Sequence, residues 1–151
     1  MARIDVRDMT LADRAAWDRM WSGNCAHYGV SPAAADNDEL WRRLTDVDVA
    51  MGALIAVDAG AKNPVGFAHY ILHPHTFSAR MVCYLEDLWV DPVARGGGVG
   101  RRLVDALIAR GKERGWRRLY WHTEAGNTAA RALYERIVPV TDYVRYDVAL
   151  Q

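Results

Sequence analysis

The sequence predicts one α/β domain over residues 1–151, with the element order β-α-α-β-β-β-α-β-α-β(-β). Three observations support this prediction. Two helix-spaced stretches precede the main strands, two apolar β-rich runs are joined by turn residues, and a third apolar run leads into a glycine-rich turn and a helix start. A chain of this length buries roughly two thirds of its unfolded surface in a single core, so no second domain is needed.

The N-terminal part of the chain predicts a strand and two helices. Apolar and charged residues alternate over residues 3–7, which is typical of a short strand. Thr10 is suited to cap a helix that covers residues 11–21. Glycines and a proline predict a loop over residues 22–33, and helical spacing resumes over residues 36–44.

The middle of the chain predicts three strands. Residues 50–57 and 65–72 are apolar and β-rich, and the turn residues between them predict an antiparallel pair. Residues 81–90 form the next strand, whose side chains are expected to alternate between two faces. One face carries Cys83, Leu85, Asp87 and Trp89, and the other carries Tyr84, Glu86, Leu88 and Val90.

The last part of the chain predicts a helix, a strand, a second helix and a closing strand. The first helix covers residues 99–114 and ends at Gly115, because glycine is the usual residue just past a helix end. A strand over residues 117–123 and a helix over residues 126–135 follow. Residues 140–148 are expected to supply one or two closing strands.

The turn between the third main strand and its helix is rich in glycine and arginine. Its glycines permit backbone angles that a β-carbon disfavours, so that successive amide N–H groups can point into one concavity. They are Gly96, Gly97, Gly98 and Gly100. The helix start adds a positive dipole end, and Arg95, Arg101 and Arg102 add full charges. The turn therefore predicts a phosphate or pyrophosphate site.

Two common phosphate-binding templates do not fit this turn. A Walker loop requires Gly-Lys-Ser/Thr, whereas Gly100 is followed by Arg101. A dinucleotide fingerprint starting at Gly96 would also need glycine at position 101. The pattern present is Arg-x-x-Gly-x-Gly, with Arg95, Gly98 and Gly100, directly after a strand that ends in Val-Asp-Pro. This pattern resembles the acyl-CoA-binding motif of the GCN5-related N-acetyltransferases (GNAT).

A second motif near the C-terminus strengthens the resemblance. Asn127, Ala130 and Tyr134 are spaced three and four residues apart, which places them on one helical face. The run Asn-x-x-Ala-x-x-Leu-Tyr is similar to the family's second cofactor motif, in which the asparagine contacts the pantetheine arm and the tyrosine lies near the thioester sulfur. The resemblance covers about residues 50–148 and has the family's order and spacing, and its local sequence resembles the branch of polyamine and small basic-protein acetyltransferases.

The resemblance implies a GNAT fold, with a mixed, mostly antiparallel sheet and helices on both faces. It also implies transfer of an acetyl group from acetyl-CoA to a primary amine by direct attack, with no metal. Cofactor contacts are implied for three segments, a strand whose backbone pairs with pantetheine, the glycine turn, and the second motif. Their residues are Leu88, Trp89 and Val90; Arg95, Gly96, Gly97, Gly98, Val99, Gly100 and Arg101; and Asn127, Ala130 and Tyr134.

The reaction needs a proton acceptor and a proton donor. An amine with a pKa near 10.4 must lose a proton before attack, and Glu86 or Asp87 can accept it. Glu86 is preferred, because polyamine acetyltransferases carry a similar Leu-Glu-Asp whose glutamate is usually assigned as the base. A structural carboxylate or an anchor for the substrate ammonium is the alternative, and His122 is a weaker candidate base. Tyr134 matches the family's general acid; its alternative role is that of a core tyrosine.

The acceptor is less clearly specified than the cofactor. Trp17, Trp21 and Tyr28, with Glu86 and Asp87, are predicted to contact it, because family members use the N-terminal helices to choose substrates. Aromatic residues at helical spacing otherwise pack in a core. Acidic residues between positions 36 and 58 suit a cationic substrate. The acceptor classes left open are small molecules, polyamines, lysine side chains and N-terminal amines.

Composition narrows the remaining function classes. A net charge of zero argues against nucleic acid and anionic membrane surfaces as partners. The two cysteines lack metal-ligand or CxxC spacing, and no targeting or membrane segment is recognised, which predicts a cytoplasmic protein. The apolar end strand and the family's frequent dimers predict a homodimer. The alternative functions are a non-catalytic acyl-CoA sensor and an unrelated nucleotide-binding protein.

Overall fold

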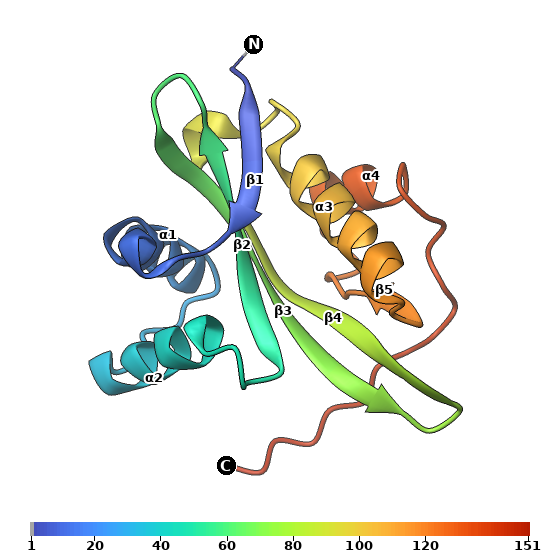
Figure 1. The fold of residues 1–151 in the computed structure, drawn as a ribbon. Helices are drawn as coiled ribbons and strands as arrows, with labels where there is room; N and C mark the ends of the chain where they lie inside the picture. The colour runs from blue at the N-terminus through green and yellow to red at the C-terminus, as the bar shows by residue number, and fades with distance from the viewer. Residues whose placement is uncertain (1) are drawn as a thin grey trace. The chain divides into compact units, whose positions relative to one another are not determined.

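The computed structural model describes residues 2–151, which form two compact units (Figure 1). The first unit extends to Trp121 and contains the sheet, and the second runs from His122 to Gln151. The single domain expected from the sequence stays a prediction. In the described part of the chain, the helices are too short or too polar to cross a membrane.

The first unit is built on a five-stranded sheet whose strands lie side by side in chain order. The strands are β1 (Ile4–Asp8), β2 (Met51–Asp58), β3 (Asn63–His75), β4 (Ser78–Val90) and β5 (Arg118–Tyr120). Neighbours among β1 to β4 pair antiparallel, and β5 pairs parallel with β4. The predicted mixed, mostly antiparallel sheet is confirmed.

Helices cover both faces of this sheet (Figure 1). One face carries α1 (Arg14–His27), which follows a 3-10 turn over Leu11–Asp13, and α2 (Ala34–Thr45). The other face carries α3 (Val99–Arg114). Successive residues of β3 show the division, because Phe67 packs with Met20 of α1, whereas Gly66 faces Val99 and Leu103 of α3. The predicted helices on both faces, and both ends of α3, are confirmed.

Helix α1 is longer than the sequence predicts. It continues through Gly23 to His27, although residues 22–33 were expected to form a loop. This glycine is needed for close packing, since a β-carbon there would lie 2.8 Å from Cζ2 of Trp89. The helix ends before Gly29, whose φ of +68° is in the left-handed region.

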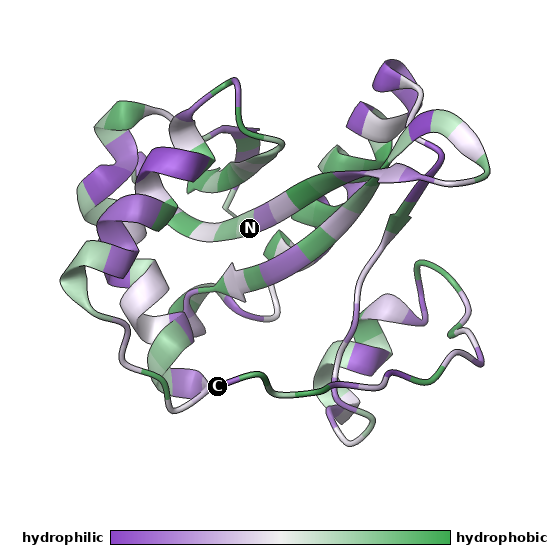
Figure 2. Cartoon of the chain, turned by 90° about the horizontal axis from the view of Figure 1, so that it is seen from below, coloured by the Kyte–Doolittle hydropathy of each residue, from purple (hydrophilic) through white to green (hydrophobic). Residues whose placement is uncertain are grey.

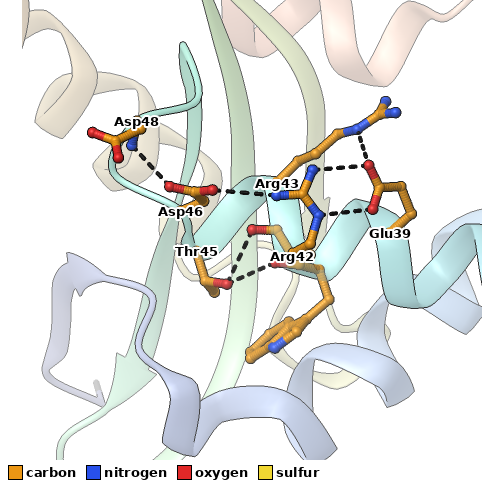
Figure 3. A network of polar contacts seen from close by, with 7 residues as sticks. Glu39, Arg42, Arg43, Thr45, Asp46 and Asp48 are labelled. Atoms are coloured by element: carbon orange, nitrogen blue, oxygen red, sulfur yellow. Dashed lines mark hydrogen bonds and ion pairs between the residues drawn. The ribbon is translucent and has the colours of Figure 1, made fainter.

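Two arginines near the end of α2 pair with Glu39 and with Asp46, which caps the helix (Figure 3). The Arg42 guanidinium donates to both carboxylate oxygens of Glu39, at 2.8 and 3.0 Å, and Arg43 Nε donates to one of them at 2.8 Å. Hydrogen bonds from Arg42, then from Arg43, lower the pKa of Glu39 to about 2. Arg42 also bonds Asp46. These exposed pairs add little stability, and they occupy carboxylates that the sequence suggested for a cationic substrate.

The C-terminal residues differ from the prediction. Strand β5 spans three residues, and the second unit contains one helix, α4 (Thr128–Tyr134). Within the described residues after α4 there is no strand, so the closing strands predicted over 140–148 are wrong for this structure. Alternation of apolar and polar residues shows which side chains would share a face if the segment were a strand. A strand also needs a neighbouring strand to hydrogen-bond with. Figure 2 shows hydrophobic residues along this segment, and Tyr146 and Leu150 are 89% and 90% exposed.

Candidate active site

Strand β4 carries a β-bulge at Glu86. Across the β3–β4 ladder, His69 lies opposite Asp87, whereas the next residue, Tyr70, lies opposite Leu85. Glu86 is the extra residue and is exposed. The bulge therefore lies at the predicted carboxylate pair.

The inserted residue changes which side chains share a face. Asp87 and Trp89 lie on the side of α1, where they meet His69 and Met20. Leu85 lies opposite Tyr70, which contacts Arg110 of α3 on the other side. The predicted single face of Cys83, Leu85, Asp87 and Trp89 is therefore wrong. Strict alternation holds only in an uninterrupted ladder, and the residues themselves give no sign of the insertion.

The pairing between strands β4 and β5 ends just before the bulge. Their ladder ends with the pair Tyr84 and Tyr120, whereas β4 continues to Val90. The segment from the bulge to Val90 is thus hydrogen-bonded to β3 on one side and not to β5 on the other. An open strand edge of this kind can accept an extended, amide-containing ligand.

The backbone of this open edge is turned outward at alternate residues. Asp91 N–H donates to Val65 O at 2.8 Å, which continues the β3–β4 ladder. Because alternate residues of an antiparallel strand direct their N–H and C=O groups to opposite sides, Leu88 and Val90 direct theirs away from β3. The Val90 carbonyl accepts a hydrogen bond from Arg95 Nε at 2.9 Å. Two of the predicted cofactor residues thus present backbone groups at the open edge.

The glycine turn has the backbone geometry that the sequence predicts. Gly96 and Gly98 have φ values of +81° and +80°, in the left-handed region. A β-carbon at either position would meet no atom within 4 Å, so the backbone angle is what favours glycine. Gly98 begins α3 without a side-chain cap, and the first helical bond runs from Arg102 N to Gly98 O at 3.1 Å. The N–H groups of the first turn therefore suit an anion.

Two arginines of the turn make local contacts. The Arg95 guanidinium lies 4.9 Å from the centre of the Trp89 ring. Arg101 Nε pairs with Asp105 one helical turn later at 3.0 Å. These contacts hold positive charge beside the start of α3.

Asp91 connects α1 to the beginning of the glycine turn. Its side chain accepts hydrogen bonds from Arg19 Nη1 at 2.7 Å and from Trp89 Nε1 at 3.1 Å. Arg19 also donates to the Pro64 carbonyl at 3.0 Å. Asp91 is only 7% exposed, so this charge is buried and paired. Sequence reasoning read Val-Asp-Pro as a strand end and missed both the aspartate and its arginine.

A buried polar chain also lies on the α1 side of the bulge. Trp17 Nε1 donates to His69 Nε2 at 2.9 Å, and His69 Nδ1 lies 3.0 Å from Asp87 Oδ2. The side chains of His69 and Asp87 are 1% and 23% exposed. Sequence reasoning missed His69; the available signal was a single histidine within an apolar strand.

The three predicted acceptor aromatics have different surroundings. Trp17 is fully buried in the core, and its predicted contact with the acceptor stays a prediction. Trp21 is partly buried, and its Nε1 donates to Asn37 Oδ1 at 2.9 Å. Tyr28 is 62% exposed just past the end of α1. Of the three, Tyr28 and Trp21 retain surface that an acceptor can reach.

The second cofactor motif forms the predicted helix in the C-terminal unit. Asn127 caps α4, because its Oδ1 accepts a hydrogen bond from Ala130 N at 3.2 Å. Tyr134 is the last residue of α4, and its carbonyl accepts from Ile137 N at 2.9 Å. Their roles toward the pantetheine arm and the thioester stay predictions.

Neither cysteine is suited to nucleophilic catalysis. Burial raises the pKa of the Cys83 thiol to about 12. Burial, and secondarily the negative charge of Asp87, raises the pKa of Cys25 in α1. Because the thiolate is the reactive form, both groups are weak nucleophiles at neutral pH. Direct attack by the acceptor therefore fits the site better than an acyl-cysteine intermediate.

Comparison with known proteins assigns the chain to a family. The profile of the acetyltransferase (GNAT) family matches residues 16–138. The chain belongs to the GNAT acetyltransferases. This GNAT acetyltransferase is 31% identical to the D-amino-acid N-acetyltransferase HPA3 of Saccharomyces cerevisiae over 144 residues, which cover 95% of the chain and 89% of that protein. It is thus an enzyme that uses acetyl-CoA as its acetyl donor.

Two further proteins illustrate the range of similar acetyltransferases. The GNAT chain is 31% identical to aminoglycoside N(6')-acetyltransferase type 1 of Stenotrophomonas maltophilia, over 85% of the chain and 81% of that protein. Its fold is similar to that of ribosomal-protein-alanine N-acetyltransferase from Brucella melitensis biovar Abortus 2308, with a TM-score of 0.78 and 24% identity over 98% of the chain and all of that structure (100%).

Proposed function

We propose that this GNAT acetyltransferase transfers the acetyl group of acetyl-CoA to a primary amine by direct attack. The observation that carries the proposal is the open edge of β4, which lies between the bulge at Glu86 and the glycine turn. An amide-containing arm bound along this edge has its phosphate end at the start of α3 and its reactive end beside a carboxylate pair.

The residues that hold acetyl-CoA in this proposal come from three segments. The N–H groups of the Gly96–Gly98 turn and the first turn of α3 bind the pyrophosphate, with charge from Arg95 and Arg101. Leu88 and Val90 pair with the pantetheine amides. The family resemblance also implies contacts of the arm with Asn127, which caps α4, and with Ala130. Acetyl-CoA supplies the activated thioester.

Proton transfers in this proposal use side chains of the chain itself. Either Glu86 or Asp87 takes a proton from the amine, directly or through water. Tyr134 donates a proton to the departing thiolate, a role that suits a phenol because it keeps its proton at neutral pH. The amine nitrogen thereby attacks as a neutral nucleophile.

The acceptor is proposed to be a small molecule with a primary amine. Relatives named for D-amino acids and aminoglycosides support this class, since both kinds of molecule carry primary amines. Trp21 and Tyr28 are the proposed acceptor contacts. A polyamine, a lysine side chain and a protein N-terminus are the competing acceptors.

Thermal unfolding with and without acetyl-CoA tests the cofactor site. Ligand at about 100 times its dissociation constant is expected to stabilise the protein by about 2.7 kcal/mol, which raises the melting temperature by several degrees. ATP and NAD are the controls. An equal shift with all three ligands, or none with acetyl-CoA, would contradict the proposed site.

Thiol release from acetyl-CoA then tests the reaction. The acceptor panel contains D-alanine, spermidine, sisomicin and a peptide with an N-terminal alanine. We expect turnover with at least one small amine, and Tyr134→Phe is expected to lower kcat while retaining acetyl-CoA affinity. Stabilisation by acetyl-CoA without turnover of any amine would favour the acyl-CoA sensor instead.

We also propose that the protein is a homodimer in which residues 140–150 pair with a second copy. From Val144 to Leu150, apolar side chains are exposed at every second position, as in Val144, Tyr146 and Val148. The sheet ends at β5, which leaves one edge of that strand for pairing. Burying the apolar positions against another copy would remove them from water.

Sedimentation velocity tests the dimer with two double variants of the same segment. Val144→Lys with Val148→Lys is expected to shift the full-length protein from dimer to monomer. The matched control is Arg145→Ala with Asp147→Ala, which removes an exposed ion pair from the alternate positions. A monomeric wild type, or a dimer that tolerates the lysines, would refute this interface.

A further inference from the structure

We infer that Asp87, and not Glu86, accepts the proton of the amine, and that His69 and Trp17 are the positioning residues that orient it. This inference rests on the proposed function. It assigns a role to two buried residues that lie on other elements than the carboxylate they serve, one on β3 and one on α1.

The hydrogen bonds from Trp17 to His69 and from His69 to Asp87 determine which nitrogen of the imidazole carries the proton. An indole Nε1–H can only donate, so His69 Nε2, at 2.9 Å from it, must accept. The ring proton is therefore on Nδ1, which donates to Asp87 Oδ2 at 3.0 Å. A doubly protonated ring would place an N–H against the N–H of Trp17. In this arrangement the imidazole is neutral, and it holds the carboxylate without neutralising it.

Packing keeps this imidazole in place. The His69 ring stacks on Phe67, with centroids 4.3 Å apart and an interplanar angle of 19°. Trp21 lies against it with centroids 5.2 Å apart, and its own indole is held by Asn37. Trp17 and His69 are 0% and 1% exposed, so water does not compete for their hydrogen bond. The Trp17 and His69 side chains of this hydrogen-bonded series are held rigidly in the core, and only the third member, Asp87, reaches the surface.

The two carboxylates at the bulge differ in how they are held. Glu86 is the inserted, exposed residue, whereas Asp87 is anchored through one oxygen on the α1 side. Asp87 bonds His69 of β3, and its charge, after burial, raises the pKa of the Cys25 thiol of α1. A general base must be held within hydrogen-bonding reach of the amine, and a fixed carboxylate meets that requirement better than a flexible one.

The proposed step transfers one acetyl group to the amine nitrogen, which loses two protons. The ammonium of the acceptor gives a proton to the Asp87 carboxylate, and the nitrogen lone pair forms a C–N bond with the acetyl carbonyl carbon. The C–S bond breaks, and its electron pair leaves with sulfur. The thiolate takes a proton, for which Tyr134 is the proposed donor, and the second proton that the amine nitrogen loses after C–N bond formation replaces it on the phenol, directly or through water.

Nitrogen-15 NMR of the His69 ring tests the positioning without any reaction. At pH 7 we expect the wild-type ring to show a protonated Nδ1 and an unprotonated Nε2, with the signals assigned by their loss in His69→Asn. Trp17→Phe is expected to abolish this single tautomer. Trp41→Phe is the matched control, since Trp41 packs 5.2 Å from Trp17 in the same cluster, and it should leave the tautomer intact. A wild-type ring protonated on Nε2 would overturn the positioning role.

Kinetics of acetyl transfer test the catalytic part. With the acceptor found among the four panel amines, Asp87→Asn is expected to lower kcat about 100-fold, and more than Glu86→Gln does. His69→Leu, which lacks a donor, should lower kcat about tenfold or more. His69→Asn places an amide N–H near the Nδ1 position and should retain kcat within a few-fold.

The outcomes separate this inference from the proposed function. If His69→Leu and His69→Asn lower the melting temperature alike but leave kcat unchanged, the chain is only structural. If Glu86→Gln lowers kcat more than Asp87→Asn, Glu86 is the base and the inference fails while the function stands. If no panel amine is acetylated, the proposed function fails, and the NMR result still decides whether His69 is oriented as we infer.

Discussion

Gly66→Ala is expected to lower the free energy of unfolding by about 3 kcal/mol, at the upper end of the usual cost of overpacking. A β-carbon at this position would lie 2.8 Å from the Trp89 carbonyl oxygen on β4 and 3.2 Å from Cγ1 of Val99 on α3. The nearer atom belongs to the backbone of a paired strand, so it cannot move without disturbing the ladder. Val99 is the first residue of α3, and the same strain should weaken acetyl-CoA binding.

Urea unfolding measures this effect, with Gly126→Ala as the matched control. A β-carbon at Gly126 would meet no atom within 4 Å, and the φ of this glycine is not positive. The control is therefore expected to change stability by less than about 0.5 kcal/mol. A loss below about 1 kcal/mol in Gly66→Ala would mean that α3 can move away from the sheet without penalty.

Gly98→Ala is expected to weaken acetyl-CoA binding at least about tenfold, which corresponds to about 1.4 kcal/mol. Gly98 has a φ of +80°, and alanine destabilises this left-handed conformation by roughly 1–2 kcal/mol. Relief of that strain rotates the peptide groups that aim the first N–H groups of α3 at the phosphate. Acetyl-CoA affinity should fall because the backbone N–H donors point in the wrong direction. A steric clash is not the cause, because the added methyl group meets no atom within 4 Å.

Gly115→Ala is the control that separates strain from binding. Gly115 ends the same helix with a φ of +70°, and a β-carbon there also meets no atom within 4 Å. Both variants should lose similar stability in thermal unfolding, but calorimetric titration should show weakened acetyl-CoA binding for Gly98→Ala alone. Equal affinities in the two variants would argue against pyrophosphate binding at this turn.

Local chemistry explains which parts of the fold could be predicted from the sequence. The antiparallel β2–β3 pair, the bounds of α3 and the glycine turn all follow from nearby residues with strong backbone preferences. Gly23 shows the limit of such rules. The same residue type marks a turn or a close contact, and only the position of the distant Trp89 ring decides which.

Local motifs predicted the segments of the candidate site that are continuous in sequence. Two features were not predictable, because both depend on register between distant segments. The bulge at Glu86 exists only relative to β3, and it moves Asp87 to the opposite face from Leu85. The buried chain joins residues separated by 52 and 18 positions, so no window of sequence contains it. Long-range pairing also explains why an alternating pattern failed to predict strands near the C-terminus.

The carboxylate of Asp91 has a practical meaning for redesign. It holds Arg19 of α1 with one oxygen and Trp89 of β4 with the other, directly before the turn that precedes α3. Helix α1 and the glycine turn are therefore not interchangeable modules. An α1 transplanted from a relative with another acceptor must bring an arginine at position 19. Without it, a buried negative charge is left unpaired directly before the glycine turn.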